Sequence, residues 1–311
     1  MVTKLLVTGG AGFMGSNFVH YVLETSSDYR IVVLDALTYA GNLNNLSGLL
    51  PKIEFVQGSI LDVELVDKLV ASSDIVVHFA AESHNDRSLE NPHVFTEVNI
   101  LGTENIASAC LKYDKRLHHV STDEVFGDLP LDSKVKFTED SKVNPSSPYS
   151  ASKAASDLLV LAWVRSFGLR ATISNSANNF GQNQFPEKLI PRTVDLIRKG
   201  QMPKIYGTGL NVRDWLYVDD HSSAVLAILS KGTLGSRYLV SSGQLYNNIE
   251  VVGYILEAFG LPPGAFEFVS DRPGHDLKYA SDSTKLQSET GWRPQGPSLQ
   301  TWIQKSLESI P

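Results

Sequence analysis

The apolar positions of this chain fall into short runs, separated by longer stretches with apolar residues at helical spacing. The short runs predict β-strands at residues 4–8, 30–34, 53–56, 74–79, 117–121 and 170–174. The longer stretches predict helices at residues 17–23, 63–70, 98–112 and 150–167. Apolar strands that alternate with helices are typical of a parallel sheet covered on both faces, so we expect an α/β fold.

The pattern changes near residue 182, where prolines begin to divide the chain into shorter pieces. These prolines stand at positions 186, 191, 203, 262 and 263. We therefore expect residues 1–181 to form the sheet domain, with later segments returning to it. Residues 182–311 are expected to form mainly a smaller C-terminal substrate-binding lobe that is interleaved with the first domain.

Composition and charge exclude several classes of protein. The chain has 311 residues, of which 42% are hydrophobic and 20% are charged, so it is not a disordered chain. Its net charge of −7 argues against a nucleic-acid-binding protein. No apolar run approaches the ~20 residues that cross a bilayer, and Cys110, the single cysteine, excludes an internal disulfide. We expect a cytoplasmic protein with no membrane partner.

A glycine-rich turn follows the first predicted strand and precedes the first helix. It places glycines at positions 9, 12 and 15, and Asp35 closes the second strand. Such a turn lets the backbone approach a pyrophosphate at a helix N-terminus, while the carboxylate accepts hydrogen bonds from ribose hydroxyls and repels a 2′-phosphate. The order of these parts predicts a Rossmann-like, doubly wound sheet that binds NAD rather than NADP. The alternative for Asp35 is a strand-end turn residue.

Tyr149 and Lys153 lie four residues apart in a predicted helix, so both side chains lie on one face. The ammonium is expected to lower the pKa of the phenol from its ordinary value of about 10 toward neutrality. The phenol would then remove a proton from a carbinol while hydride leaves to NAD⁺. The alternative is a solvated helix start after Pro148.

Thr122, Asp123 and Glu124 follow the fifth predicted strand, at the edge where ligands of such sheets bind. Two adjacent carboxyls suit a reaction in which one removes a carbon-bound proton and the other protonates a leaving hydroxyl. Neighbouring strand residues point to opposite faces, so the chain must turn here for both to reach one substrate. The alternative is an Asp-Glu cap of the turn at Val125.

Several blocks are shared with known enzymes over nearly the whole chain. They are residues 9–15, 80–84 with 86–88, 121–127, 149–153, 178–181, 185–191, 211–218 and 271–276. On these blocks the chain resembles the extended short-chain dehydrogenase/reductase family and, within it, the nucleotide-sugar 4,6-dehydratases.

The resemblance implies a reaction on one retained NAD, with dTDP-glucose as the expected substrate. Tyr149 takes the proton of the 4-hydroxyl while hydride leaves C4. Glu124 then removes the C5 proton, Asp123 protonates the departing 6-hydroxyl, and hydride returns to C6. Thr122 would hold the sugar near O4, and Lys153 would bind the nicotinamide ribose. The family also forms homodimers through the helices at 98–112 and 150–167.

No Cys or carboxylate lies at metal-like spacing from His118 and His119, so we expect no metal. The resemblance further implies two sets of binding residues. The cofactor set is Gly9, Gly12, Phe13, Met14, Gly15, Asp35, Leu37, Thr38, Ser59, Ile60, Ala80, Ala81, Ser83, Val98, Tyr149, Lys153 and Asn179. The substrate set is His84, Thr122, Asn178, Lys188, Leu189, Lys204, Ile205, Tyr206, Arg213, Asn248, Asp271, Arg272 and His275. Arg213 is the best diphosphate candidate, because its fork matches phosphate oxygens. Its alternative is an ion pair with Asp214, and the alternative for Lys188 is a solvated helix face.

The chain departs from the family pattern at a few positions. Asn85 stands where an apolar residue is usual, Ser59 replaces an aspartate expected near adenine, and residues 175–177 differ as well. These departures leave the preference for dTDP or UDP open.

Two other functions remain as alternatives. One is a nucleotide-sugar 4-epimerase or decarboxylase of the same family, which needs no acid pair after the threonine. The other is a non-catalytic NAD-sensing protein, which would be expected to lose Tyr149 or Lys153.

Overall fold

The computed structural model describes residues 2–310, and within this range seven parallel strands form the main sheet. Their spatial order is β10-β6-β5-β4-β1-β2-β3. The strands are β1 (Thr3–Thr8), β2 (Tyr29–Asp35), β3 (Glu54–Gln57), β4 (Ile75–His78), β5 (Arg116–Thr122), β6 (Ala171–Ser176) and β10 (Arg237–Val240). Because β1 pairs with both β2 and β4, the direction of the connections reverses beside β1. Ligands of doubly wound sheets bind at such a reversal, beyond the carboxyl ends of the strands.

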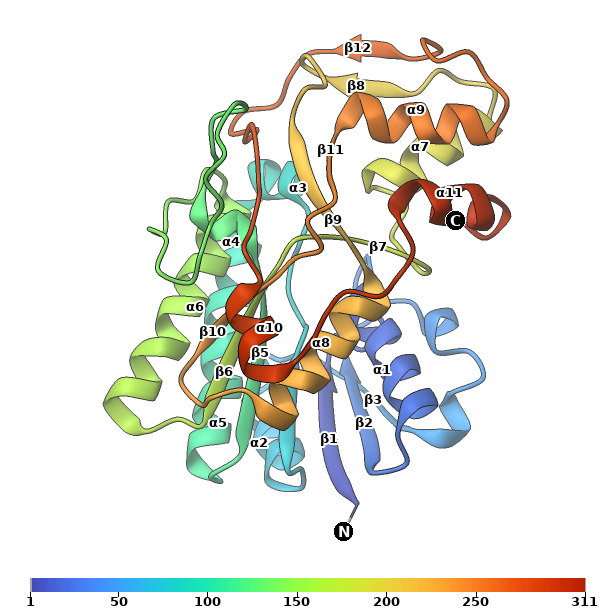
Figure 1. Cartoon of the computed structure of the whole chain (residues 1–311). Helices are drawn as coiled ribbons and strands as arrows, with labels where there is room; N and C mark the ends of the chain where they lie inside the picture. The colour runs from blue at the N-terminus through green and yellow to red at the C-terminus, as the bar shows by residue number, and fades with distance from the viewer. Residues whose placement is uncertain (1, 311) are drawn as a thin grey trace.

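Helices cover both faces of the sheet (Figure 1). On one face α1 (Phe13–Thr25) packs against α8 (Val218–Lys231), which also contacts α10 (Thr284–Thr290). On the other face lie α2 (Val63–Ala71), α5 (Gly102–Lys112) and α6 (Pro148–Phe167). The strands are therefore buried on both sides, which explains why their sequences are apolar without alternation.

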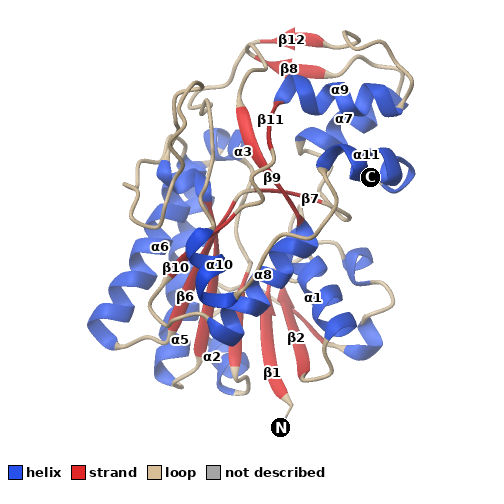
Figure 2. Cartoon of the chain, in the orientation of Figure 1, coloured by secondary structure: helices blue, strands red, loops and turns tan. Residues whose placement is uncertain are grey.

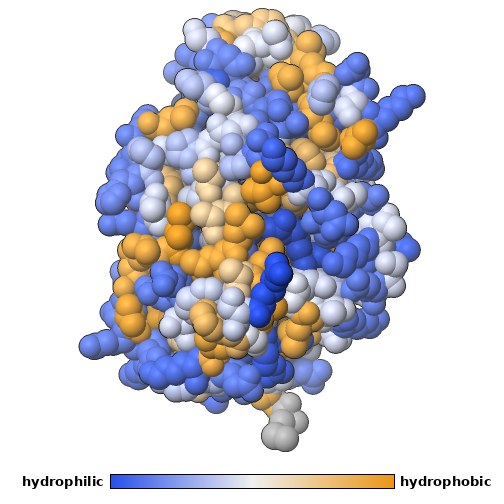
Figure 3. All heavy atoms as spheres, turned by 90° about the vertical axis from the view of Figure 1, so that its left-hand side faces the viewer, coloured by the Kyte–Doolittle hydropathy of each residue, from blue (hydrophilic) through white to orange (hydrophobic). Residues whose placement is uncertain are grey.

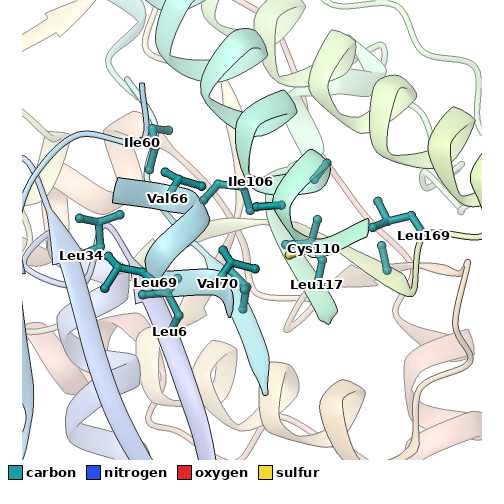
Figure 4. Packing of buried hydrophobic residues seen from close by; sticks show 14 of the residues in the cluster. Leu6, Leu34, Ile60, Val66, Leu69, Val70, Ile106, Cys110, Leu117 and Leu169 are labelled. Carbon is teal, nitrogen blue, oxygen red and sulfur yellow. The ribbon is translucent and has the colours of Figure 1, made fainter. Parts of the chain in front are cut away.

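The core on the α2–α5 side consists of closely packed aliphatic side chains. Figure 4 shows Leu6 of the sheet beside Leu69 and Val70 of α2, and Leu117 of the sheet beside Cys110 of α5. Cys110 belongs to the same cluster and is fully buried.

The smaller lobe lies over the carboxyl edge of the sheet (Figures 1 and 2). Its strands are β7 (Asn178–Phe180), β8 (Lys204–Tyr206), β9 (Val212–Tyr217), β11 (Leu245–Asn247) and β12 (Glu267–Val269). Its helices are α7 (Leu189–Arg198), α9 (Asn248–Ala258) and α11 (Leu299–Ser306). Phe180, Trp215 and Trp302 are at the centre of its core. Since α8, β10 and α10 return to the main sheet, the two parts are interleaved; the boundary at residue 181 stays a prediction.

Short helical segments complete the chain. They are η1 (Leu43–Leu46), η2 (Leu50–Lys52), α3 (Asn85–Glu90), α4 (Pro92–Phe95), the π-helical turn η3 (Thr96–Leu101), η4 (Asp123–Phe126) and η5 (Leu307–Ser309). Across residues 2–310, no helix combines the length and the apolar character needed to span a membrane.

The α/β prediction is confirmed, and all six predicted strands are present to within two residues at each end. Two features differ. The pattern did not predict β10, which has only four residues and begins with Arg237. The helix predicted at 98–112 is preceded by the π-turn η3, in which Asn99 accepts a hydrogen bond from the Glu82 amide (2.8 Å) and donates to Ser152 Oγ (2.8 Å).

Candidate active site

Two adjoining cavities lie at the carboxyl edge of the sheet. The first has a volume of about 350 Å³ and is lined by the glycine-rich turn and by the ends of β2, β4 and β5. The second, of about 160 Å³, is lined from α3, α7, β8 and the segment at 272–279. The residues that line both are Ser83, Glu124, Asn178, Glu187, Lys188, Leu189 and Trp215. A ligand that extends from one cavity into the other therefore passes Glu124.

The glycine-rich turn brings backbone close to the first cavity. Gly9 has a φ of +70°, a conformation that favours glycine. A Cβ on Gly15 would lie 2.2 Å from the Gly9 carbonyl oxygen, so no larger residue fits there. The first turn of α1 is thus packed against the loop, with its amide groups at the cavity, which is a suitable environment for a pyrophosphate.

Asp35 is held at the end of β2 by two backbone amides. Ala11 N donates to its Oδ2 and Leu37 N donates to its Oδ1, both at 2.8 Å. Each oxygen keeps a further lone pair for a ribose hydroxyl. Asp35 therefore stabilises its own turn and also lines the first cavity.

Several polar atoms in the wall of the first cavity have no hydrogen-bond partner in the part of the chain that the structure describes, and they indicate whether a polar ligand such as NAD fits there. Ser121 Oγ, Asn178 Oδ1 and Gln184 Oε1 are buried, line the first cavity and find no hydrogen-bond partner among residues 2–310. Buried polar atoms without partners are rare in folded proteins. Together with the glycine turn and Asp35, they form the walls expected for a polar dinucleotide such as NAD.

Tyr149 and Lys153 project from the first two turns of α6. Ser147 caps this helix in a capping box with Ser150, and Pro148 occupies its first turn. Tyr149 and Lys153 are both buried and both line the first cavity, so the alternative of a solvated helix start is wrong.

The pKa of Tyr149 is raised in the structure, not lowered as the sequence predicts. Burial and the nearby Glu124 carboxylate raise its pKa well above the ordinary value, and a hydrogen bond with Thr122 lowers it only in part. The Lys153 ammonium donates instead to the Val120 carbonyl oxygen (2.9 Å). Burial lowers the pKa of Lys153 to about 8, against the opposing effect of Asp157.

The chain turns directly after β5, as the pair of carboxyls requires. Thr122 accepts a hydrogen bond from the Glu124 amide (3.3 Å) and caps η4, which carries Asp123 and Glu124. Glu124 lines both cavities, whereas Asp123 is almost fully buried behind them. Burial and the adjacent Glu124 raise the pKa of Asp123 well above its ordinary value. Asp123 is thus suited to hold a proton and Glu124 to accept one. The turn cap suggested as the alternative also exists, but Thr122 makes it.

The second cavity contains several cationic and hydrogen-bonding side chains of the predicted substrate set. Arg272 forms an ion pair with Asp86 of α3 (3.0 Å). Arg213 donates to the carbonyl oxygens of Val212 and Asp276 and lies over the Tyr279 ring, so it is not paired with Asp214. Asp214 instead accepts from the amides of Ser242 and Gly243.

Lys188 and His84 line the wall nearest the first cavity. Lys188 donates to the Ser83 carbonyl oxygen (2.9 Å), so it is not a solvated helix-face lysine. Burial and nearby cations, Lys188 first among them, lower the pKa of His84 to about 4, which leaves its ring neutral at physiological pH.

The cavities bring together nearly all of the predicted residues. Those that line the first cavity are Gly9, Gly12, Phe13, Met14, Gly15, Asp35, Thr38, Ser59, Ile60, Ala80, Ala81, Ser83, Val98, Thr122, Glu124, Tyr149, Lys153 and Asn179. Those that line the second are His84, Asn178, Lys188, Leu189, Lys204, Ile205, Tyr206, Arg213, Asn248, Arg272 and His275.

Two predicted binding residues lie outside both cavities. Leu37 has a φ of +50° and packs against the core beside α1, since its amide is turned toward Asp35. Asp271 accepts a hydrogen bond from His275 Nδ1 (2.7 Å) and supports that residue from behind. Ligand contacts by these two residues therefore stay a prediction.

Sequence reasoning missed other residues at the site. Tyr279 lines the second cavity, as does Asn85, which the sequence had singled out only as a departure from the family pattern. Phe185 lines the first cavity, and Asn99 anchors the loop at Glu82. Phe185 lies inside the shared block 185–191, so the resemblance could have predicted its place at the site. No pattern in the sequence identified Asn99, because its role arises from contacts with residues far away in the chain.

The comparisons with known proteins agree with this geometry. A family model described as GDP-mannose 4,6 dehydratase matches residues 6–305. The chain is 52% identical over 305 residues to a dTDP-glucose 4,6-dehydratase of Mycolicibacterium smegmatis, covering 98% of this chain and 92% of that protein.

Solved structures share the fold of this chain, and the dehydratase among them shares more of its sequence than the epimerase does. A dTDP-glucose 4,6-dehydratase from Streptomyces venezuelae with NAD and TYD bound matches with a TM-score of 0.93 at 40% identity, covering 98% of this chain and 96% of that one. A UDP-glucose 4-epimerase from Thermotoga maritima with UDP-glucose reaches a TM-score of 0.89 but only 27% identity, covering 98% of each chain. On the family match, the identity along nearly the whole chain and the shared fold, this chain belongs to the GDP-mannose 4,6 dehydratase family and, within it, to the dTDP-glucose 4,6-dehydratases.

Proposed function

We propose that this protein catalyses the NAD-dependent dehydration of dTDP-glucose to the 4-keto-6-deoxy sugar nucleotide. The observation that carries the proposal is the position of Glu124, at the junction of the two cavities and beside a buried Asp123. A reductase that only exchanges alcohol and ketone needs no such pair. The chemistry that NAD supplies when bound is the acceptance of hydride from C4 and its return to C6.

Tyr149, Thr122 and Lys153 would carry out the first step. Tyr149 takes the proton of the 4-hydroxyl, and Thr122 shares a hydrogen bond with the phenol and the sugar oxygen. The phenol is buried and its pKa is raised, so it needs added positive charge to act as a base. Lys153, one turn further along α6, would supply this charge from the chain itself.

Glu124 and Asp123 would carry out the elimination. Oxidation at C4 acidifies the C5 hydrogen, and Glu124 removes it. Asp123 gives its proton to the departing 6-hydroxyl, which leaves as water. The raised pKa of Asp123 supports this order of roles, because an acid must still hold its proton at neutral pH.

The second cavity would bind the nucleotide diphosphate. Arg272 is the clearest phosphate ligand, since it is held at the wall by a single carboxylate that an incoming phosphate can replace. The guanidinium of Arg213 already donates hydrogen bonds to two carbonyl oxygens and lies over the Tyr279 ring. We therefore propose that it stabilises the cavity wall and does not bind the diphosphate directly.

The direct test is mass spectrometry of dTDP-glucose incubated in D₂O with the purified protein and no added cofactor. We expect a product that has lost one water and gained one deuterium at C5, formed with NAD that purifies with the protein. A sugar returned with unchanged mass, from dTDP-glucose and from UDP-glucose alike, would contradict dehydration and favour the epimerase or the NAD-sensing alternative. Loss of CO₂ from UDP-glucuronate would instead favour the decarboxylase.

We further propose that the protein is a cytoplasmic homodimer that pairs through α5 and α6. On this side Leu101, Leu158 and Phe167 are 48%, 52% and 60% exposed. Figure 3 shows apolar residues gathered across the middle of this face. Apolar patches of this kind on otherwise polar surfaces commonly mark interfaces.

A further inference from the structure

Asn85, the first residue of α3, joins two parts of the active site through its side chain. Its Nδ2 donates to Glu124 Oε2 at 2.9 Å. Its Oδ1 accepts from Ser147 Oγ at 2.7 Å. Ser147 is the N-cap of α6, which carries Tyr149 and Lys153. One amide therefore connects the acidic turn after β5 with the start of the helix that carries the tyrosine.

The neighbours of this amide determine its orientation. Ser147 Oγ accepts a hydrogen bond from the Ser150 amide (3.1 Å) and also contacts Ser150 Oγ (2.9 Å). When Ser150 Oγ donates in the second contact, the Ser147 proton goes to the Asn85 oxygen. An ionised carboxylate can only accept, so the NH₂ group must face Glu124. A rotated amide would place its oxygen against the carboxylate and lose the hydrogen bond to Glu124.

The contact leaves Glu124 held on one side and open on the other. Oε2 is bound by Asn85, whereas Oε1 accepts no hydrogen bond from any residue in the range 2–310. Glu124 also lines both cavities, so a substrate group can approach it there. A base that is fixed through one oxygen and open at the other is suited to abstract a proton from a defined direction.

We propose that Asn85 is a positioning residue that holds Glu124 in the orientation for removing the C5 proton. This inference rests on the proposed dehydratase function, in which Glu124 is the base. Asn85 acts through Glu124 and does not itself exchange protons with the substrate. It has no hydrogen bond with Tyr149, Lys153 or Thr122 among the described contacts, so the oxidation at C4 does not depend on it directly.

The proposal predicts that a substitution at Asn85 separates the two halves of the reaction. Asn85→Leu keeps a similar volume and removes the donor. Although an apolar residue is usual here in the family, the variant tests how Glu124 is held in this chain, where Asn85 binds it directly. In the holoenzyme with dTDP-glucose in D₂O, we expect C5 deuteration and product formation to fall about 10- to 100-fold, as a misplacement near 1 Å can cause. Bound NADH should form at the wild-type rate and accumulate. Glu124→Gln should show the same accumulation in stronger form.

A matched control lies at the other end of α3. Asn91→Leu makes the same chemical change at the exposed C-cap of that helix, outside both cavities, and should leave every rate unchanged. Ser147→Ala removes the cap of α6 as well as the partner of Asn85, so it should slow oxidation and elimination together. If the leucine variant does not fold, Asn85→Ser, which is smaller and polar, allows the same comparison of NADH formation with C5 deuteration.

Two results would overturn the positioning role. Equal slowing of NADH formation and C5 deuteration in the Asn85 variants would show a general structural effect, and unchanged rates would show that Glu124 needs no support from Asn85. Absence of dehydration in the wild-type protein is a different result, since it removes the proposed function and this inference with it.

Discussion

At the scale of single residues, adjacent carboxyls in one turn occupy opposite electrostatic environments. Asp123 is buried, and neither of its oxygens accepts a hydrogen bond within the described part of the chain. Glu124, one residue further, reaches both cavities and is bound by an amide. Burial disfavours the charged form of Asp123, so the turn separates a proton donor from a proton acceptor. Distinct roles for chemically similar groups thus follow from their environments.

This difference predicts how stability depends on pH. The folded-state pKa of Asp123 lies well above its value of 3.8 in an unfolded chain. Below pH 3.8 Asp123 is protonated in the folded and in the unfolded chain, and its contribution to the free energy of unfolding is complete. As pH rises from there through the folded-state pKa, that contribution is lost, by at most about 1.4 kcal/mol per pH unit. The side chain of the Asp123→Asn variant cannot ionise, so the free energy of unfolding of the variant should increase relative to that of the wild type as pH rises. The variant should also lose product formation.

Denaturant unfolding of both proteins at mildly acidic, neutral and alkaline pH measures this effect. Asp140→Asn, at an exposed position, is the control and should follow the wild-type curve. A constant difference between wild type and Asp123→Asn at all pH values would show that Asp123 has no raised pKa.

At the scale of elements, α6 connects the catalytic groups to a buried ionic network. Asp157, one turn after Lys153, is fully buried between His119 (3.3 Å) and Arg237 of β10 (3.3 Å). It also accepts from Asn175 of β6 (2.8 Å). Burial raises the pKa of Asp157, but His119, Arg237 and Lys153 outweigh that effect and keep the pKa below its ordinary value. The network therefore joins α6 to the strands at one edge of the sheet.

Removing this charge should destabilise the protein strongly. Asp157→Asn leaves the buried Arg237 without its anion, which typically costs about 3–5 kcal/mol. Asp67→Asn breaks an exposed surface pair with Lys112 and should destabilise the protein much less, because water screens such pairs. Chemical unfolding of the two variants compares them directly, and equal losses would mean that the buried network does not hold β10 to α6.

At the scale of the whole molecule, the smaller lobe closes the carboxyl edge of the sheet and an apolar face lies on the side of α6 (Figures 1 and 3). The proposed homodimer would cover this face. Leu158→Asp places a charge in it and should convert the dimer into a monomer in sedimentation velocity. Leu261→Asp, at an exposed leucine of the smaller lobe, should leave the sedimentation coefficient unchanged. A wild-type monomer at micromolar concentration would contradict the dimer.

The sequence by itself determined those features that depend on neighbours along the chain. The glycine turn before α1, the four-residue spacing of Tyr149 and Lys153 and the apolar strands are local patterns, and the structure places all of them as expected. The family and the cofactor followed from the same blocks, and the comparisons confirm both. Local patterns are readable because helix and strand periodicity directly set which side chains share a face.

The tertiary structure alone decided the contacts that join distant segments. Asn85 meets Glu124 across 39 positions, and Arg272 meets Asp86 across 186. The direction of the Lys153 ammonium toward Val120, the raised pKa of Tyr149 and the position of Leu37 behind Asp35 arose in the same way. Such contacts, and the burial that shifts the pKa values, depend on how separate elements pack in space, and that packing is not contained in the spacing of residues along any one of them.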